Sequence, residues 1–238
     1  MNLPSHLSAS QINTFILCPY KWLCGKLDRP QTRVDEKAAI FGRGVHESIM
    51  LYYDKIKGDN GNWEEMVDEA FSEGTNWAND SMAAKTKRVK KNFMLIERER
   101  IRKKLPAPEL VERRMKVKIF DGLPPLVLIP DAYFSGIIRD WKTGRRTEMG
   151  NDWLIQGKVY QMGLEKEGHP VKRVVFNCLD AGLEVCMPRI SDGWLEKQVK
   201  QVCEMIEGDR FPSKPNNFCN WCPFILSCQL RKKCSWSR

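Results

Sequence analysis

The sequence lacks several features that would place it outside the ordinary globular proteins. No apolar run approaches the roughly 20 residues that a membrane-spanning helix needs. The first residues show no cationic stretch followed by an apolar one, so we expect no secretory signal peptide. No internal repeat and no low-complexity segment is present. We therefore expect a cytoplasmic globular protein, and 238 residues are enough for one substantial core.

Histidine is scarce, with three residues, whereas cysteine is frequent, with nine. An odd number of cysteines in a chain without a signal peptide argues against a disulfide framework. Three of them, Cys219, Cys222 and Cys228, follow the pattern Cys-x2-Cys-x5-Cys, which is typical of a metal site. Both zinc and an iron–sulfur cluster accept four cysteine ligands. The candidates for the fourth ligand are the distant Cys18 and the local Cys234.

Acidic residues are outnumbered, and the formal net charge is +9. The excess is concentrated between residues 85 and 104, which hold ten Lys or Arg and two Glu. A basic stripe of this kind attracts phosphate backbones, and the alternative is a solvated helix face. The candidate DNA-binding residues on the stripe are Lys87, Arg88, Lys90 and Lys91.

Hydrophobic periodicity predicts several helices before a small sheet. The predicted helices cover residues 8–17, 20–27, 38–56, 62–79, 83–103, 151–166 and 192–207. The predicted strands cover residues 109–120, 126–129, 137–138, 171–179 and 183–188. Ser8 and Gln11 have the spacing of a capping box at the first helix, and Asn151 or Asp152 is expected to cap the helix that follows the central strands. This order predicts an α/β fold in which a small mixed sheet is flanked by helices.

We expect a single domain over residues 1–238. Its first part, residues 1–105, is predicted to be mainly helical, and residues 106–208 are predicted to form the α/β core. Residues 209–238 form a segment that contains the clustered cysteines.

The stretch 126–142 carries two carboxylates and a lysine. We expect two short strands joined by a tight turn at residues 135–136, with Asp131 on the first strand and Asp140 at the end of the second. Strand alternation places Asp140 and Lys142 on the same face. Two close carboxylates repel each other unless a cation lies between them, and oxygen ligands suit Mg²⁺ or Mn²⁺. The alternative is a solvated strand end with an ordinary ion pair.

Further motifs accompany this stretch in a fixed order along nearly the whole chain. They are Ser10, Phe15, Cys18-Pro19 and Trp22; Gly42 and His46; Asp131; Asp140, Lys142, Thr143 and Gly144; Gln156 and Tyr160; and the three C-terminal cysteines. Together they resemble the RecB-like iron–sulfur branch of the PD-(D/E)xK nuclease superfamily, which includes CRISPR-associated single-strand exonucleases and the AddB nuclease domain. The sequence departs from the family at Pro130, because the family has a Gly-x-x-Asp pattern before its first aspartate. Proline suits only an edge strand or a bulge.

The resemblance implies a restriction-endonuclease-like core and a metal-dependent DNA nuclease. The implied activity is that of an exonuclease on single-stranded ends, with endonuclease activity as a further option, in recombination, repair or CRISPR adaptation. The implied partners are DNA and recombination or CRISPR proteins. Two alternatives stay open: a catalytically impaired nuclease fold that only binds DNA or a partner, and a zinc-containing nucleic-acid-binding protein.

The resemblance also implies roles for individual residues. The implied ligands of Mg²⁺ or Mn²⁺ are His46, Asp131, Asp140 and the main-chain carbonyl of Trp141, and the family's strand glutamate corresponds to Glu112. Lys142 would position or help to activate the attacking water, and Gln156 and Tyr160 would contact DNA or Lys142. The implied ligands of a structural [4Fe–4S] cluster, which would join the N- and C-terminal segments, are Cys18, Cys219, Cys222 and Cys228.

Overall fold

A computed structural model describes residues 1–31, 36–58, 62–75 and 80–230. Its helices are α1 (Ala9–Leu17), α2 (Pro19–Lys26), α3 (Lys37–Gly58), α4 (Trp63–Gly74), α5 (Asp80–Arg102), α6 (Asn151–Lys166) and α7 (Asp192–Glu207). Its strands are β1 (Leu7–Ser8), β2 (Leu110–Val111), β3 (Met115–Val117), β4 (Leu126–Leu128), β5 (Ala132–Phe134), β6 (Ile137–Lys142), β7 (Arg173–Cys178) and β8 (Leu183–Cys186). Two 3₁₀ turns, η1 (Cys219–Trp221) and η2 (Ile225–Ser227), follow. Within the described residues, no helix combines the length and apolarity that crossing a membrane requires.

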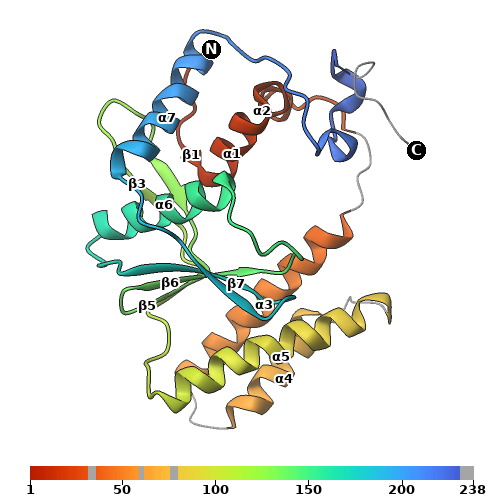
Figure 1. Ribbon diagram of the computed structural model, residues 1–238, viewed down its shortest axis with the longest axis vertical. Coiled ribbons are helices and arrows are strands. Elements are labelled where there is room, and N and C mark those ends of the chain that lie inside the picture. The colour runs from red at the N-terminus through yellow and green to blue at the C-terminus, as the bar shows by residue number, and fades with distance from the viewer. Residues whose placement is uncertain (32–35, 59–61, 76–79, 231–238) are drawn as a thin grey trace.

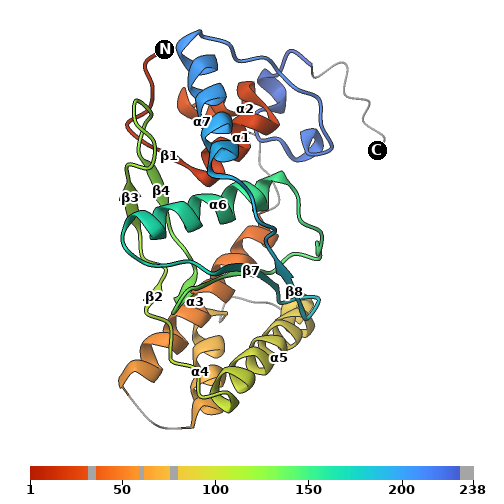
Figure 2. The same ribbon diagram turned by 60° about the vertical axis from the view of Figure 1, so that its left-hand side comes forward.

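The strands form two mixed sheets. The larger has five strands in the order β2-β5-β6-β7-β8, and β6 and β7 are its parallel pair. The smaller has three strands in the order β1-β4-β3. Helices α3, α4 and α5 lie on one side of the larger sheet, and α6 lies on the other (Figures 1 and 2). The predicted α/β class, with small mixed sheets flanked by helices, is confirmed.

The two faces of the larger sheet bury separate apolar clusters. One cluster joins α6, α1 and α7 to β7 and includes Trp153, Val159 and Phe176. The other joins α3, α4 and α5 to β5 and β6 and includes Phe93 and Trp141. Strand β7 is buried at five consecutive positions, as expected for a strand that helices cover on both sides. The central strands are therefore held by apolar packing on both faces of the sheet.

Local signals located most helices correctly. The Ser8–Gln11 capping box is present with both of its hydrogen bonds. The N-cap of α6 is Gly150 rather than Asn151 or Asp152, because the side chain of Asp152 instead pairs with Arg146. Helix α4 ends at Gly74, and the predicted continuation over residues 76–79 lies outside the described residues.

Two strand predictions were wrong, each for its own reason. The single strand predicted over 109–120 is divided into β2 and β3, because Glu112 adopts a φ of 46° that ends the extended backbone. The hairpin predicted from 126–129 and 137–138 is also incorrect: β4 pairs with β1 and β3, and β5 is the partner of β6 across the 135–136 turn. The chain changes sheets at Pro130, whose lack of an N–H suits a break in the pairing.

Candidate active site

The sheet register aligns three carboxylates across adjacent strands. Asp131 directly precedes β5 rather than lying on β4, and Asp140 lies inside β6 rather than at its end. In the antiparallel pair β5–β6, Ala132 faces Arg139, so continuing the register by one residue places Asp131 opposite Asp140. The pair β2–β5 places Glu112 opposite Asp131 in the same way, and the Glu112 amide donates to the Asp131 carbonyl at 3.2 Å. Residues opposite each other in a sheet have neighbouring side chains.

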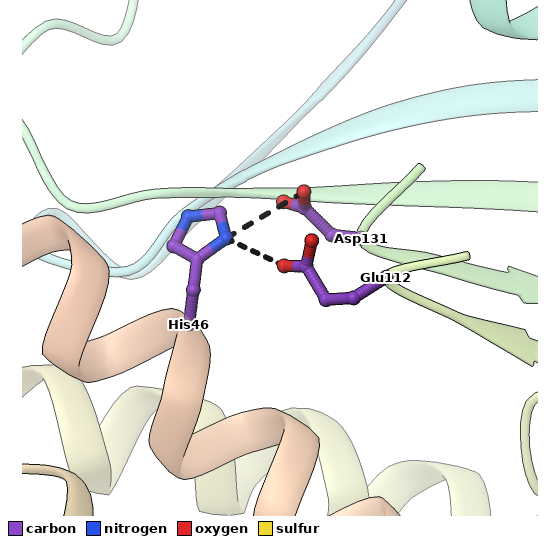
Figure 3. A group of neighbouring side chains, drawn as sticks. All are labelled: His46, Glu112 and Asp131. Atoms are coloured by element: carbon purple, nitrogen blue, oxygen red, sulfur yellow. Dashed lines mark hydrogen bonds and ion pairs between the residues drawn. The ribbon is translucent and has the colours of Figure 1, made fainter. Parts of the chain in front are cut away.

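His46 reaches this row of acids from α3 (Figure 3). Its Nδ1 lies 3.0 Å from Oε1 of Glu112 and 3.5 Å from Oδ1 of Asp131. One ligand atom from each of these three residues lies within 4.8 Å of the others. A helix and two chain segments, far apart in the sequence, thus bring an imidazole and two carboxylates together.

The backbone of Trp141 ties His46 to Asp131. The Trp141 amide donates to Oδ2 of Asp131 at 2.6 Å, and Nε2 of His46 lies 3.0 Å from the Trp141 carbonyl oxygen. The indole ring is buried and meets Phe93 edge-on, with ring centroids 5.6 Å apart. The aromatic core therefore fixes the main chain from which the predicted carbonyl ligand projects.

Asp140, Lys142 and Gln156 form a closed triangle of one ion pair and two hydrogen bonds. The Lys142 ammonium lies 2.6 Å from Oδ1 of Asp140 and donates to Oε1 of Gln156 at 2.7 Å. The amide nitrogen of Gln156 donates to Oδ2 of Asp140 at 2.9 Å and to the Tyr160 hydroxyl at 2.9 Å. Alternation along β6 and the four-residue spacing on α6 bring these groups together, as the sequence predicts.

The carboxylates of the site change the pKa values of Asp131 and His46. Burial and then the charge of Asp140 raise the pKa of Asp131 well above its usual range. Burial alone would lower the pKa of His46, but Asp131, Glu112 and Asp140 outweigh it and raise that pKa to about 9. Nδ1 of His46 faces the Glu112 carboxylate and Nε2 faces the Trp141 carbonyl oxygen, so both nitrogens donate when the ring is protonated. The imidazolium then offsets part of the negative charge of the neighbouring carboxylates.

The donor set fits a hard divalent cation. Carboxylates, a main-chain carbonyl and an imidazole are ligands that Mg²⁺ or Mn²⁺ accepts. Oδ1 of Asp140 is buried and accepts no well-aligned hydrogen bond, although the Lys142 ammonium lies 2.6 Å away. An acceptor of this kind suits a metal ligand. A possible His and carboxylate metal site is therefore present in the described part of the chain.

Glu112 is the residue that sequence reasoning left out of the metal set. The resemblance matched it to the family's glutamate, but a continuous strand predicted over 109–120 gave no register for it. The available signal was the run of charges at residues 112–114, which interrupts an apolar strand and marks its end. Its contact with His46 joins positions 66 residues apart, which periodicity does not reveal.

The four predicted DNA-binding residues on α5 differ in their surroundings. Lys87 and Lys91 are exposed. The ammonium of Lys90 lies 2.8 Å from Asp68, and Nε of Arg88 donates to Asp180 at 2.6 Å. Two of the four charges are therefore already paired within the protein.

The predicted cluster ligands share one cavity but do not gather closely. Cys18, Cys219, Cys222 and Cys228 all line one small cavity of about 30 Å³. Within the described ranges, no three cysteine sulfurs lie within 4.8 Å of one another, so the arrangement does not show a metal cluster. Cys234, the competing ligand, lies outside the described residues.

Comparison with known proteins agrees with this geometry. The chain is similar to a solved structure of a candidate exonuclease from Eubacterium rectale, with a TM-score of 0.54, 15% identity and coverage of 93% of this chain and 92% of that chain. SSO0001 is similar at a TM-score of 0.46 and 11% identity, over 96% of this chain and 88% of that one. No curated protein matches significantly in sequence. At 15% identity, the similarity to the Eubacterium rectale structure shows the fold alone.

A sequence model of one family covers almost the whole chain. The model of the PD-(D/E)XK nuclease superfamily matches residues 6–229, which include every residue placed in the site above. The residues that the sequence resemblance predicts as two acidic elements and a lysine are Asp131, Asp140 and Lys142, and the sheet register and an ion pair bring them together. The chain belongs to the PD-(D/E)XK nuclease superfamily.

Proposed function

We propose that this protein is an Mg²⁺- or Mn²⁺-dependent deoxyribonuclease that acts as an exonuclease on single-stranded ends in recombination, repair or CRISPR adaptation. The observation that carries the proposal is the row of Glu112, Asp131 and Asp140 between His46 on one side and Lys142 on the other. The superfamily supplies the class of reaction, phosphodiester hydrolysis, and the row supplies the groups that such a reaction needs.

His46, Asp131, Asp140 and the Trp141 carbonyl would hold the metal, with Glu112 completing its surroundings. Such a metal polarises the phosphate and lowers the pKa of a bound water. His46, held by Glu112, orients the site through its contact with the Trp141 carbonyl. Proton release from its imidazolium would accompany metal binding, because a ligating imidazole is neutral.

Lys142 would position the attacking water and offset charge on the phosphate oxygens. Its ammonium is held between Asp140 and Gln156, and it lies 5.3 Å from the ring centroid of Phe176. A hydrogen-bond donor that already points to where negative charge develops lowers the activation barrier, because it does not have to move during the reaction. Gln156 orients this lysine, and the buried Tyr160 braces Gln156 from the next turn of α6.

The geometry favours an enzyme over a binding module with an impaired site. Pro130 lies in the link where the chain changes sheets, so it removes no hydrogen bond from β5. The Asp131 side chain still lies 3.5 Å from His46 and accepts the Trp141 amide at 2.6 Å. Proline before the first aspartate is therefore compatible with an assembled site.

Nuclease assays with end-labelled single- and double-stranded DNA in EDTA, Mg²⁺ or Mn²⁺ test this function. We expect digestion from single-stranded ends only when a divalent metal is present. Binding of DNA without cleavage in both metals would instead support the impaired module. A circular single strand serves as the control, because an exonuclease leaves it intact whereas an endonuclease opens it.

We also propose that Cys18, Cys219, Cys222 and Cys228 hold a structural [4Fe–4S] cluster, as in the iron–sulfur branch. The cysteine spacing and the cavity that the four residues share support this proposal.

Cys18→Ser should abolish a brown chromophore near 400 nm, whereas Cys24→Ser, Cys203→Ser and Cys234→Ser should keep it. Iron content and absorbance of protein purified without oxygen check it. A colourless Cys234→Ser protein beside a brown Cys18→Ser protein would overturn this ligand set, and bound zinc would identify the zinc-containing alternative.

A further inference from the structure

The two segments that meet around the cysteine cavity contain no acidic residue. Residues 1–27 and 210–230 hold four Lys or Arg and not one Asp or Glu, although the chain has 30 acids. The two segments pack together through the stacked rings of Trp22 and Phe211, whose centroids are 6.0 Å apart. The Tyr20 hydroxyl also donates to the Ser227 carbonyl at 2.6 Å. We call these two segments the acid-free lobe.

The basic side chains of the acid-free lobe are those of Lys21, Lys26, Arg210 and Lys214, and in the described part of the chain none of the four forms an ion pair. The Met1 ammonium, which also belongs to the lobe, lies 2.7 Å from Asp209. Lys26, Arg210 and Lys214 are exposed. The basic residues of α5 differ, because several of them are paired with acids on the same or neighbouring helices. The lobe therefore presents uncompensated positive charge to an anionic partner.

Two large aromatic side chains project from the same part of the lobe. Phe218 is 58% exposed and Trp221 is 63% exposed. They are three residues apart across η1, and the Trp221 amide donates to the Phe218 carbonyl at 3.1 Å. Side chains at positions i and i+3 of a 3₁₀ turn lie on one side, so the two rings share a face. Exposed aromatic rings beside basic residues are the features by which proteins bind single-stranded nucleic acid.

The lobe is joined directly to the helix that carries Gln156. The Asn13 side chain on α1 donates to the Asp152 carbonyl at 2.9 Å, one turn before Gln156 on α6. Figures 1 and 2 show α1 lying against α6, with α2 and the C-terminal segment beyond it. Between lobe and site, the Trp153 ring lies 4.6 Å from the Arg146 guanidinium and 5.6 Å from the Lys142 ammonium. The lobe is therefore in direct contact with the helix that positions the predicted catalytic lysine.

We infer that Phe218 and Trp221 form a base-stacking platform for single-stranded DNA, with the acid-free lobe attracting its phosphates. The inference rests on the proposed function for the identity of the nucleic acid, and it adds a second contact region outside the metal site. Stacking needs unpaired bases, so a platform of this kind selects single strands over duplexes.

Binding measured without metal tests the platform separately from the chemistry. The protein is titrated in EDTA into a fluorescein-labelled single-stranded oligodeoxynucleotide and into an abasic oligomer of the same length. The test variant is Phe218→Leu with Trp221→Leu, which keeps apolar side chains and removes both rings. Leu226→Ala is the matched control, because Leu226 is 60% exposed on the same segment and has no ring.

We expect the ring variant to bind the normal oligomer about tenfold more weakly for each ring lost, and the Leu226→Ala control to bind like the parent. Affinity for the abasic oligomer should be low and equal in all three proteins. Equal loss for both oligomers, or no loss for either, would overturn the platform. Equal melting temperatures of parent and variant confirm that folding is unchanged. If ring loss weakens binding but the parent cleaves nothing in Mg²⁺ or Mn²⁺, the catalytic proposal fails and the platform stands.

Discussion

The candidate active site and the acid-free lobe are built in opposite ways. In the active site, groups from two helices and three strands or their ends hold one another through short hydrogen bonds and ion pairs, such as those of the Lys142–Gln156–Asp140 triangle. In the lobe, four cysteines line one cavity without gathering, and two large rings face solvent. The chain determines the first arrangement by itself, whereas both proposals for the second depend on groups other than amino acids.

The contrast suggests different tasks for the two regions: the active site is built for the reaction, and the lobe is built for binding. Sheet register holds the side chains of the acidic row at hydrogen-bonding distances from their neighbours, and catalysis depends on placement of this accuracy. The lobe has charge and stacking surfaces, which tolerate small displacements because every base presents a flat face. Substitutions in the site should therefore reduce rate, and substitutions in the lobe should reduce affinity.

The largest effect should come from Asp140→Asn. The variant keeps the side chain's size but loses a metal ligand, so cleavage should fall by about 10³-fold. DNA binding in EDTA should persist or strengthen, because a negative charge beside the phosphate is removed. Initial rates and anisotropy titrations measure the two effects.

Glu184→Gln is the matched control for that variant. Glu184 lies on β8 of the same sheet and pairs with Arg139 and Asn177, away from the acidic row. Its cleavage rate should stay within about twofold of the parent, as for most surface substitutions. Full activity of Asp140→Asn would refute the site.

Lys142→Met should have the next largest effect. The variant keeps most of the apolar stem but removes the ammonium that faces Asp140 and Gln156, and loss of one preorganised donor lowers cleavage by about 10²-fold. Binding of Mn²⁺, measured by calorimetry, should be retained because the carboxylates are unchanged. Lys116→Met, at an exposed lysine on β3, should cleave like the parent. Loss of Mn²⁺ binding in Lys142→Met would assign the lysine to metal-site architecture instead.

Local signals in the sequence were sufficient for one part of the site. Asp140 and Lys142 share a face because of strand alternation, and Gln156 and Tyr160 share one because of helix periodicity, so neither placement needs tertiary information. The capping box of Ser8 was found for the same reason. The motif order, rather than any single motif, pointed to the superfamily that the family match establishes.

Contacts between segments far apart in the chain could not be predicted from local sequence patterns. The positive φ of Glu112 divides a strand that alternation predicts as continuous, and this break brings its carboxylate to His46. The change of sheets at Pro130 gives β4 new partners, which depend on β1 at the start of the chain. Spacing indicated that the cysteines bind metal, but it contains no information on how closely their sulfurs approach.

Gly74→Ala should disturb the support of the active site without changing its chemistry. An added methyl group would clash with the hydroxyl of Ser48 and lie 2.8 Å from the Gly44 carbonyl, where α4 crosses α3 near His46. Overpacking of this kind should lower the free energy of unfolding by about 2 kcal/mol, measured by urea denaturation. Gly193→Ala on α7 meets nothing within 4 Å and should leave stability unchanged or slightly raised. Equal stability of both variants would show that the helix crossing adjusts freely.

The smallest effect on DNA binding should come from substitutions on α5. Two double variants compare the exposed charges of this helix with its paired charges. Lys87→Gln with Lys91→Gln removes two exposed charges, and Arg88→Gln with Lys90→Gln removes two charges that already pair with Asp180 and Asp68. If α5 contacts DNA, the first pair should flatten the dependence of binding on salt by about 0.7 per lost contact, since each contact releases counterions from a single strand. The second pair should change this slope less, because protein acids compete for those charges. Anisotropy titrations across a salt series measure both slopes. Equal, unchanged slopes would make α5 a solvated face and leave the acid-free lobe as the main electrostatic contact.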